Sequence, residues 1–158
     1  MRGVQVICVG KLKEKFYSDA CAEYAKRLGG YCKLTVTELP EEKLPARPSR
    51  AQIAAALEKE AAAIRAKLLP GALVAALCVE GRLCSSEELA AKLRAWEDAR
   101  QVVFLIGGSY GLDAALKAEA RERLSMSPMT FPHHLARVML LEQLYRGFKI
   151  NEGGTYHK

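Results

Sequence analysis

The chain has 158 residues, of which 50% are hydrophobic and 27% are charged, and its formal net charge is +6. This is the composition of a globular protein, and it excludes wholly disordered, collagen-like and low-complexity chains. Because a domain usually holds about 100–200 residues, the length predicts one domain spanning residues 1–158.

The first part of the chain predicts two strands, two helices and a long loop. Short runs rich in β-branched residues predict buried strands, and apolar residues spaced four apart predict one face of a helix. Gly29 and Gly30 end the first helix, and a capping box at Ser49 and Gln52 starts the second. In chain order we expect a strand at 4–9, a helix at 16–28, a strand at 33–39, a proline-rich loop at 40–48 and a helix from 50 to about 69.

The remainder of the chain continues this alternation. Ser85 and Asp113 are capping residues that start two helices, and Pro132 precedes the last helix. We expect a strand at 73–79, a helix from 86 to about 99, a strand at 102–106, a helix from 114 to about 121, a strand at 124–126 and a helix from 133 to about 150. Strands that alternate with helices predict an α/β fold with a mostly parallel sheet and helices on both faces.

The last helix carries apolar residues on more than one face. A helix that is apolar all round is buried on every side, so this helix is either central to the core or covered by a second copy of the chain. Glu142 and Arg146 stand four residues apart within it, which favours an ion pair. An arginine beside a ligand cleft is the alternative interpretation of Arg146.

Several classes of protein and site are disfavoured by the sequence. The apolar runs are far shorter than the roughly 20 residues that a membrane-spanning helix needs, and no signal peptide precedes the first strand, so we expect a cytoplasmic protein. The five cysteines form no C-x-x-C pair, which favours buried, reduced thiols. Histidines 133 and 134 are adjacent and point about 100° apart on a helix, and no other cluster has metal-ligand spacing, so no metal site is expected.

Three predicted strand ends, at 77–81, 106–111 and 126–131, suit a ligand. Ligands bind beyond the carboxyl ends of parallel strands, and glycines there allow the backbone to approach closely. Ordinary tight turns are the alternative. The glycines match neither the dinucleotide-binding fingerprint nor the phosphate-binding loop of nucleotide triphosphatases. The net positive charge favours a polyanionic partner.

A combination of segments resembles one known family. These segments are Val9–Lys15, Ile106–Leu112, Met129–His133, Arg137–Val138, Glu142–Ile150 and Tyr156–Lys158. Together they are similar to the RlmH family, the small SPOUT-class methyltransferases that act on a pseudouridine of large-subunit ribosomal RNA. The resemblance covers essentially the whole chain.

The resemblance implies a fold and a reaction. The fold is an α/β knot, in which the C-terminal half of a parallel-sheet domain forms a deep trefoil. The reaction is methylation of N3 of a pseudouridine in 23S rRNA on the assembled ribosome, with S-adenosylmethionine as cofactor and a homodimer as the working form. A knotted tRNA methyltransferase and a catalytically silent ribosome-binding protein are the alternatives.

The resemblance also implies site residues. Arg146, Tyr156 and His157 match the catalytic residues, with His157 as a candidate base and Arg146 as a group that stabilises an anion or holds a phosphate; His133 is a weaker candidate. We expect the tail, residues 151–158, to have few anchors and to become ordered only against a second copy or RNA. The implied cofactor-binding residues are Leu77, Gly107, Gly108, Met126, Ser127, Pro128, Met129, Thr130 and Phe131.

Overall fold

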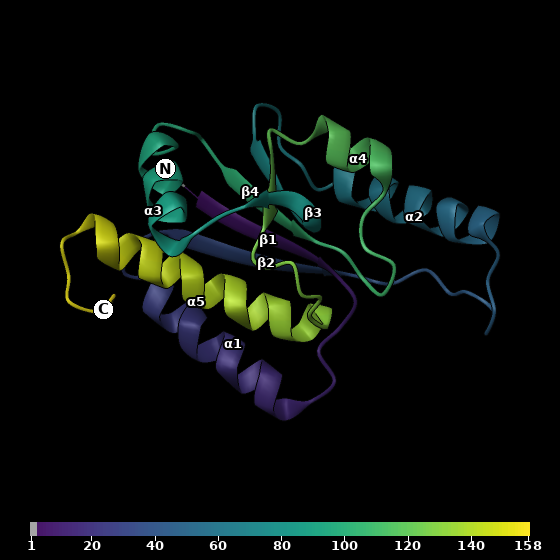
Figure 1. Ribbon diagram of the computed structural model, residues 1–158, viewed down its shortest axis with the longest axis horizontal. Helices are drawn as coiled ribbons and strands as arrows, with labels where there is room; N and C mark the ends of the chain where they lie inside the picture. The colour runs from purple at the N-terminus through teal and green to yellow at the C-terminus, as the bar shows by residue number, and fades with distance from the viewer. Residues whose placement is uncertain (1–2) are drawn as a thin grey trace.

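The computed structural model describes residues 3–158; Met1 and Arg2, the first residues of the predicted domain, lie outside the described range. Strands and helices alternate along the chain, as predicted (Figure 1). The elements are β1 (Gly3–Val9), α1 (Lys15–Leu28), β2 (Lys33–Leu39), α2 (Arg50–Arg65), β3 (Leu73–Leu83), α3 (Ser86–Ala95), β4 (Val102–Ile106), α4 (Ala114–Glu119), β5 (Glu122–Ser125) and α5 (His133–Asn151).

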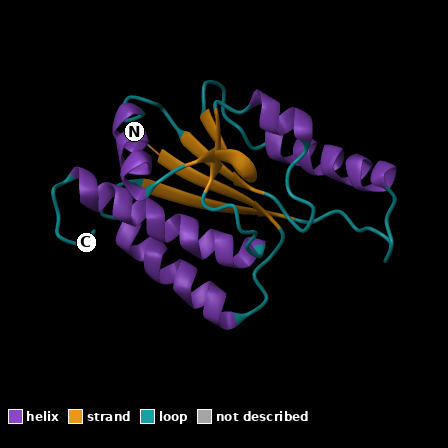
Figure 2. Ribbon diagram, viewed as in Figure 1, coloured by secondary structure: helices purple, strands orange, loops and turns teal. Residues whose placement is uncertain are grey.

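The strands form one sheet in the order β2-β1-β4-β3-β5, and every pair of neighbours is parallel. Helices α1, α3 and α5 cover one face of the sheet, and α2 and α4 cover the other (Figure 2). The predicted α/β class, the parallel sheet and the helices on both faces are thus confirmed. Because both faces are covered, a central strand such as β4 is apolar at every position and buried throughout.

Some predicted boundaries were wrong. Helix α2 ends at Arg65 instead of near 69. Beyond Ala66 the backbone hydrogen bonds join residues three apart instead of four, and Pro70 and Gly71 follow. Helix α3 ends at Ala95, where Trp96 leaves the helical conformation. Strand β3 runs four residues further than predicted, and β5 starts two residues earlier. Both differences arise because β3 and β5 pair along the edge of the sheet.

The extension of β3 has an unusual register. Leu124 of β5 pairs with Leu77 of β3 and again with Arg82, so residues 78–81 arch out of the ladder between the two contacts. Gly81 within this arch lies so close to β5 that a Cβ atom there would stand 2.8 Å from the backbone of Arg123. The arch therefore passes tightly against β5, at a point where only glycine fits.

The cysteines are less buried than predicted. All five are free, but only Cys8, on β1, is fully buried, while Cys21, Cys32, Cys78 and Cys84 are half-buried. Burial raises the pKa of the Cys8 thiol to about 12. In the described part of the chain, no helix is both long enough and apolar enough to cross a membrane.

Arg137 ties the start of α5 to the sheet. Its side chain is 4% exposed, and it donates to a carboxylate oxygen of Glu38, at the end of β2, at 2.7 Å. Its other terminal nitrogen donates to the carbonyl of Gly10 at 3.1 Å. Burial alone would raise the Glu38 pKa, but hydrogen bonds from Arg137 and from the Leu12 amide lower it below its ordinary value of 4.5.

Replacing Arg137 with methionine should destabilise the fold by about 2–3 kcal/mol, because the Gly10 carbonyl and the Glu38 carboxylate lose their buried partner. A carboxylate whose pKa is lower in the folded than in the unfolded state stabilises the fold above its unfolded pKa, and this contribution is lost as the pH falls. The variant should therefore lose less stability than the wild type on acidification below pH 4.5.

Urea unfolding at neutral and acidic pH measures both effects. Arg65→Met is the matched control, because Arg65 pairs with Glu119 on the surface and such exposed pairs contribute only about 0–1 kcal/mol. If both variants lost the same free energy of unfolding, a special role for Arg137 would be contradicted.

Candidate functional site

A cleft of about 700 Å³ opens beyond the carboxyl ends of β3, β4 and β5. We call it the strand-end cleft. Its walls are formed by residues 77–80, 106–112 and the segment from 124 to 136, which correspond to the three predicted strand ends. The structure brings together every predicted cofactor-binding residue except Pro128; those that line the cleft are Leu77, Gly107, Gly108, Met126, Ser127, Met129, Thr130 and Phe131.

The glycine loop after β4 is folded back on itself. Gly111 has a φ of +78°, and its amide donates to the Gly108 carbonyl at 3.1 Å. A Cβ atom on Gly107 would overlap the backbone of Gly111. The loop is thus both a tight turn and a bare backbone surface on the cleft, so the two interpretations of these glycines are compatible.

A carboxylate from a distant loop holds this turn in place. The Ser109 amide donates to Oε1 of Glu41 at 2.7 Å, and a Cβ atom on Gly108 would lie 2.7 Å from the same oxygen. Glu41 belongs to the proline-rich segment that sequence reasoning treated only as a loop. Its role depends on tertiary contact, and no local signal pointed to it.

Serine hydroxyls hold the wall of the cleft that is formed by the segment from 124 to 136. Ser125 Oγ donates to the Ser127 carbonyl at 2.9 Å, and the Met129 amide donates to Ser127 Oγ at 3.0 Å. Across the cleft, Lys117 and Glu80 form an ion pair. The predicted strand end at 77–81 contained Glu80, but nothing in the sequence indicated that Lys117 would face it.

The strand-end cleft fits the cofactor that the resemblance implies. Its volume lies within the roughly 300–1,000 Å³ of ordinary small-molecule sites. Apolar side chains such as Leu77 and Leu112 provide a surface for a flat base, while the Lys117–Glu80 pair and the bare glycine backbone provide polar partners.

The two adjacent histidines are held by neighbours. His133 packs against Gly10, where a Cβ atom would stand 2.9 Å from its ring, and burial lowers its pKa. His134 contacts the Lys11 carbonyl at 3.2 Å and stacks on Tyr17 at 5.7 Å. Both line the cleft. Residues 3–158 contain no group of three or more side chains placed to hold a metal ion.

The three predicted catalytic residues lie together, and we call them, with Glu142 and Glu87, the tail cluster. Nδ1 of His157 lies 3.2 Å from a terminal nitrogen of Arg146, and its Nε2 lies 2.7 Å from Glu87. The Tyr156 hydroxyl donates to Glu142 at 3.2 Å. The expectation that the tail has few anchors was therefore wrong: its anchors are on α3 and α5, distant in sequence.

These contacts indicate which ring nitrogen of His157 accepts a hydrogen bond and which donates one. Every nitrogen of an arginine side chain is a donor, so Nδ1 of His157 must be the acceptor in its contact with Arg146. Nε2 then carries the ring proton and donates to the Glu87 carboxylate. The Nδ1 lone pair thus faces Arg146 and accepts from it.

The tail cluster does not line the strand-end cleft of its own chain. Helix α5 connects the two, because His134 is a cleft residue near its start and Arg146 follows twelve residues later. At 1.5 Å per residue these positions are about 18 Å apart along the helix. The structure thus divides the predicted site into two separate halves.

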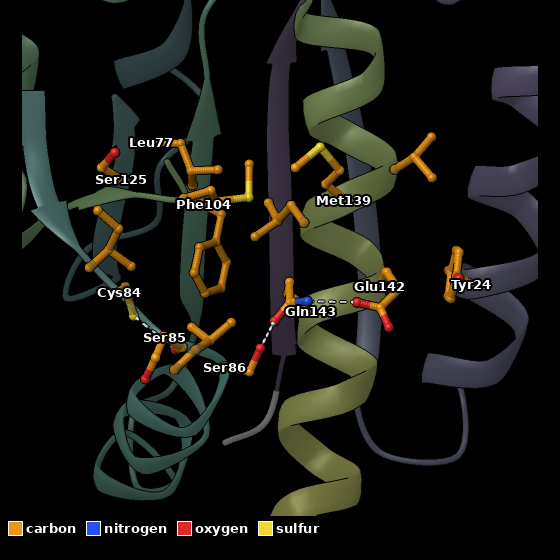
Figure 3. A pocket seen from close by; sticks show the side chains of 15 residues that line it. Tyr24, Leu77, Cys84, Ser85, Ser86, Phe104, Ser125, Met139, Glu142 and Gln143 are labelled. Atoms are coloured by element: carbon orange, nitrogen blue, oxygen red, sulfur yellow. Dashed lines mark hydrogen bonds between the residues drawn. The ribbon is translucent and has the colours of Figure 1, made fainter. Parts of the chain in front are cut away.

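A second cavity, of about 470 Å³, lies between the sheet and helices α1, α3 and α5 (Figure 3). We call it the helix-side cavity. It shares Leu77, Leu124, Ser125 and Met126 with the strand-end cleft. One side is polar: Ser86 Oγ donates to Gln143 at 2.6 Å, and Gln143 donates to Glu142 at 2.8 Å. Its lining comes from six elements, so sequence reasoning could not assemble it.

Comparison with known proteins identifies close relatives. The family model described as "Predicted SPOUT methyltransferase" matches residues 2–157. The chain is 46% identical over 157 residues to "Ribosomal RNA large subunit methyltransferase H" of Listeria monocytogenes serotype 4a (strain HCC23), covering 98% of this chain and 99% of the relative. The protein of the same name from Bifidobacterium adolescentis is also 46% identical, with the same coverage.

Solved structures share the fold at low sequence identity. A probable methylase family protein from Haemophilus influenzae Rd KW20 superimposes with a TM-score of 0.57 at 14% identity, covering 99% of this chain and 71% of that chain. A probable methyltransferase from Bordetella pertussis Tohama I gives a TM-score of 0.57 at 19% identity, covering 92% and 96%. At these identities the likeness concerns the fold alone.

Proposed function

This chain belongs to the SPOUT methyltransferase family, and we propose that it methylates N3 of a pseudouridine in 23S rRNA on the assembled ribosome. Its relatives are named as methyltransferases of large-subunit ribosomal RNA. The observation that carries the proposal is the strand-end cleft, where the folded-back glycine loop and the loops at 77–80 and 124–136 surround one cavity. We treat residues 1–158 as one catalytic domain.

The strand-end cleft is the proposed cofactor site. S-adenosylmethionine, when bound, supplies a methyl group on a positively charged sulfur that is a good leaving group. The loops at 107–111 and 126–131, with Pro128 supporting the second loop from outside the cleft lining, would hold it through backbone groups. The apolar side chain of Leu77 would contact the base.

The tail cluster is the proposed site of proton removal. N3 of the target base carries a proton that must leave for N3 to accept a methyl group. The lone pair on Nδ1 of His157, which accepts from Arg146 in this structure, would take that proton when Arg146 donates to the base instead, and Glu87 on Nε2 favours the positive ring that forms. The Arg146 nitrogen that now faces Nδ1 is then free to donate to the developing anion on the base.

The two halves of the site come together, in this proposal, from two copies of the chain. The separation of about 18 Å along α5 keeps the tail cluster away from its own cleft, and a twofold dimer with antiparallel α5 helices would place it at the partner's cleft. Helix α5 supports this arrangement, because no side chain from His133 to Ile150 is fully exposed and several apolar ones, such as Val138 and Met139, are only half-buried.

We also propose that the C-terminal half is knotted as in the family. Ordinary domains avoid knots. The support for the knot is membership of the family, together with the arch at 78–81, which passes close to β5. Stretching a single molecule tests it: a knotted chain stays shorter than the contour expected at about 3.3–3.6 Å per residue, and full extension would rule the knot out.

The proposed partner is a polyanion, in keeping with the net charge of +6. Lys11 and Lys13 are exposed on the loop after β1, beside His134 at the edge of the strand-end cleft. An RNA backbone crossing this edge would bring a base to the cleft. Because the ribosome is the substrate, the reaction takes place in the cytoplasm.

A methyl-transfer assay tests the function. The protein and labelled S-adenosylmethionine are incubated with ribosomes from cells that lack this activity, and in parallel with bulk tRNA. We expect methylpseudouridine from large-subunit rRNA, identified by digestion and mass spectrometry. Label only in tRNA would overturn the substrate and keep the cofactor. Cofactor binding without label in either RNA would indicate a catalytically silent ribosome-binding protein.

A further inference from the structure

Glu142 is the common partner of two side chains in the tail cluster. Its Oε1 accepts from Nε of Arg146 at 3.0 Å and from a terminal nitrogen of Arg146 at 2.6 Å. The same oxygen accepts from the Tyr156 hydroxyl at 3.2 Å. Two hydrogen bonds from one guanidinium fix its plane as well as its position, which a single contact cannot do.

These bonds determine where the rest of the arginine points. With Nε and one terminal nitrogen engaged by Glu142, the remaining terminal nitrogen of Arg146 faces His157 at 3.2 Å. The guanidinium carbon lies 4.8 Å from the centre of the Tyr156 ring. The orientation of both proposed catalytic side chains that flank His157 thus depends on one carboxylate.

The environment of Glu142 makes this contact more than an ordinary surface ion pair. The Glu142 side chain is 16% exposed and that of Arg146 24%, so solvent screens them less than a fully exposed pair. Glu142 also lines the helix-side cavity, where Gln143 donates to its second oxygen at 2.8 Å (Figure 3). Its carboxylate is therefore held from several sides.

We infer that Glu142 is a positioning residue, which acts on methyl transfer only through Arg146 and Tyr156 by fixing their orientation toward His157. The inference rests on the proposed function, because the reaction that Arg146 would assist is the methylation of RNA. It adds a residue to which the family resemblance gave no role.

The residue directly after this helix provides a matched control. Glu152 accepts from Lys149 at 2.8 Å and from the Tyr31 hydroxyl at 2.9 Å, so it too joins a cation and a tyrosine. None of these three residues belongs to the tail cluster or lines either cavity. Glu152→Gln therefore reproduces the loss of a carboxylate that joins a cation and a tyrosine, without removing a contact of Arg146.

Glu142→Gln should lower kcat about 10–100-fold, because a misplacement of about 1 Å in a reacting group can cost that much. The affinity for S-adenosylmethionine should stay within about twofold, since the strand-end cleft is untouched. Glu152→Gln should keep kcat within about twofold, and Glu142→Asp, which retains the charge, should recover part of the loss. A kcat for Glu142→Gln equal to that of Glu152→Gln would overturn the inference.

A combined variant separates positioning from direct action. If Glu142 acts only through Arg146 and Tyr156, Glu142→Gln should have little further effect when Arg146 is already alanine and Tyr156 already phenylalanine. A second loss as large as the first would show that Glu142 acts on the reaction independently, and would overturn the inference in the form stated.

A spectroscopic measurement needs no activity. The Nε–H resonance of Arg146, observed in protein labelled with 15N-arginine, reports the hydrogen bond to Glu142 directly. It should move in Glu142→Gln and stay in place in Glu152→Gln. An unmoved resonance in Glu142→Gln overturns the inference even if the protein methylates rRNA. A wild type that methylates no RNA overturns the proposed function, whatever the resonance does.

Discussion

Replacing Gly107 with alanine should lower the affinity for S-adenosylmethionine by about 100-fold or more and abolish methyl transfer at ordinary cofactor concentrations. The added methyl group would overlap the backbone of Gly111, which cannot rotate away as a side chain can. The turn from 107 to 111 would therefore have to open, and it forms one wall of the strand-end cleft. Isothermal titration with S-adenosylmethionine measures the effect.

Gly71→Ala is the control for adding a methyl group to a glycine of this chain. Gly71 precedes β3 at a φ of +78°, and a Cβ atom there would meet no neighbour within 4 Å. The control should lose some stability through backbone strain, of about 1 kcal/mol, but bind the cofactor normally. Unchanged affinity in Gly107→Ala would show that the cofactor does not depend on this loop.

Two inactive variants should restore activity when they are paired in one dimer. A chain with Gly107→Ala lacks a cofactor cleft and keeps its tail cluster, while a chain with His157→Ala keeps the cleft and lacks the proton acceptor. If each site combines the cleft of one chain with the tail cluster of its partner, the mixed dimer has one intact site. We expect about half of the wild-type activity per dimer.

The measurement uses two affinity tags, so that only mixed dimers are purified and assayed. Each variant alone should be at least about 100-fold slower than wild type, which sets the background. A mixed dimer as slow as the single variants would mean that cleft and tail cluster act within one chain, by way of the helix-side cavity that joins their surroundings. A chain that elutes as a monomer would contradict the dimer itself.

The order and class of the elements could be predicted because they depend on local patterns. The strand at 102–106 is apolar at every position, and the capping boxes at Ser49 and Ser85 have the predicted hydrogen bonds in the structure. The three loops of the strand-end cleft could be predicted as neighbours, because the carboxyl ends of parallel strands share one edge of the sheet. The identity of the cofactor came from resemblance alone.

Features that depend on long-range contacts could not be predicted from the sequence. The tail has no periodicity of its own, and its order comes from Glu87 on α3 and Glu142 on α5. The buried Arg137 finds its partner Glu38 almost a hundred positions earlier in the chain. The extra length of β3 depends on β5, which pairs with it a second time beyond the arch. No local pattern contains the partner in these cases.

Helix α5 sets limits on how this chain can vary. The cleft wall at its start and Arg146 near its end lie on one continuous helix, His133–Asn151. Deleting a single residue between them would turn everything beyond it by about 100° about the helix axis and shorten the helix by about 1.5 Å. Arg146 and the tail, which both lie beyond the deletion, would then turn together away from Glu87 on α3, although every side chain of the site remained. A change in a neighbouring side chain can compensate for a substitution in this helix. No such change can compensate for an altered number of residues between the cleft and the tail.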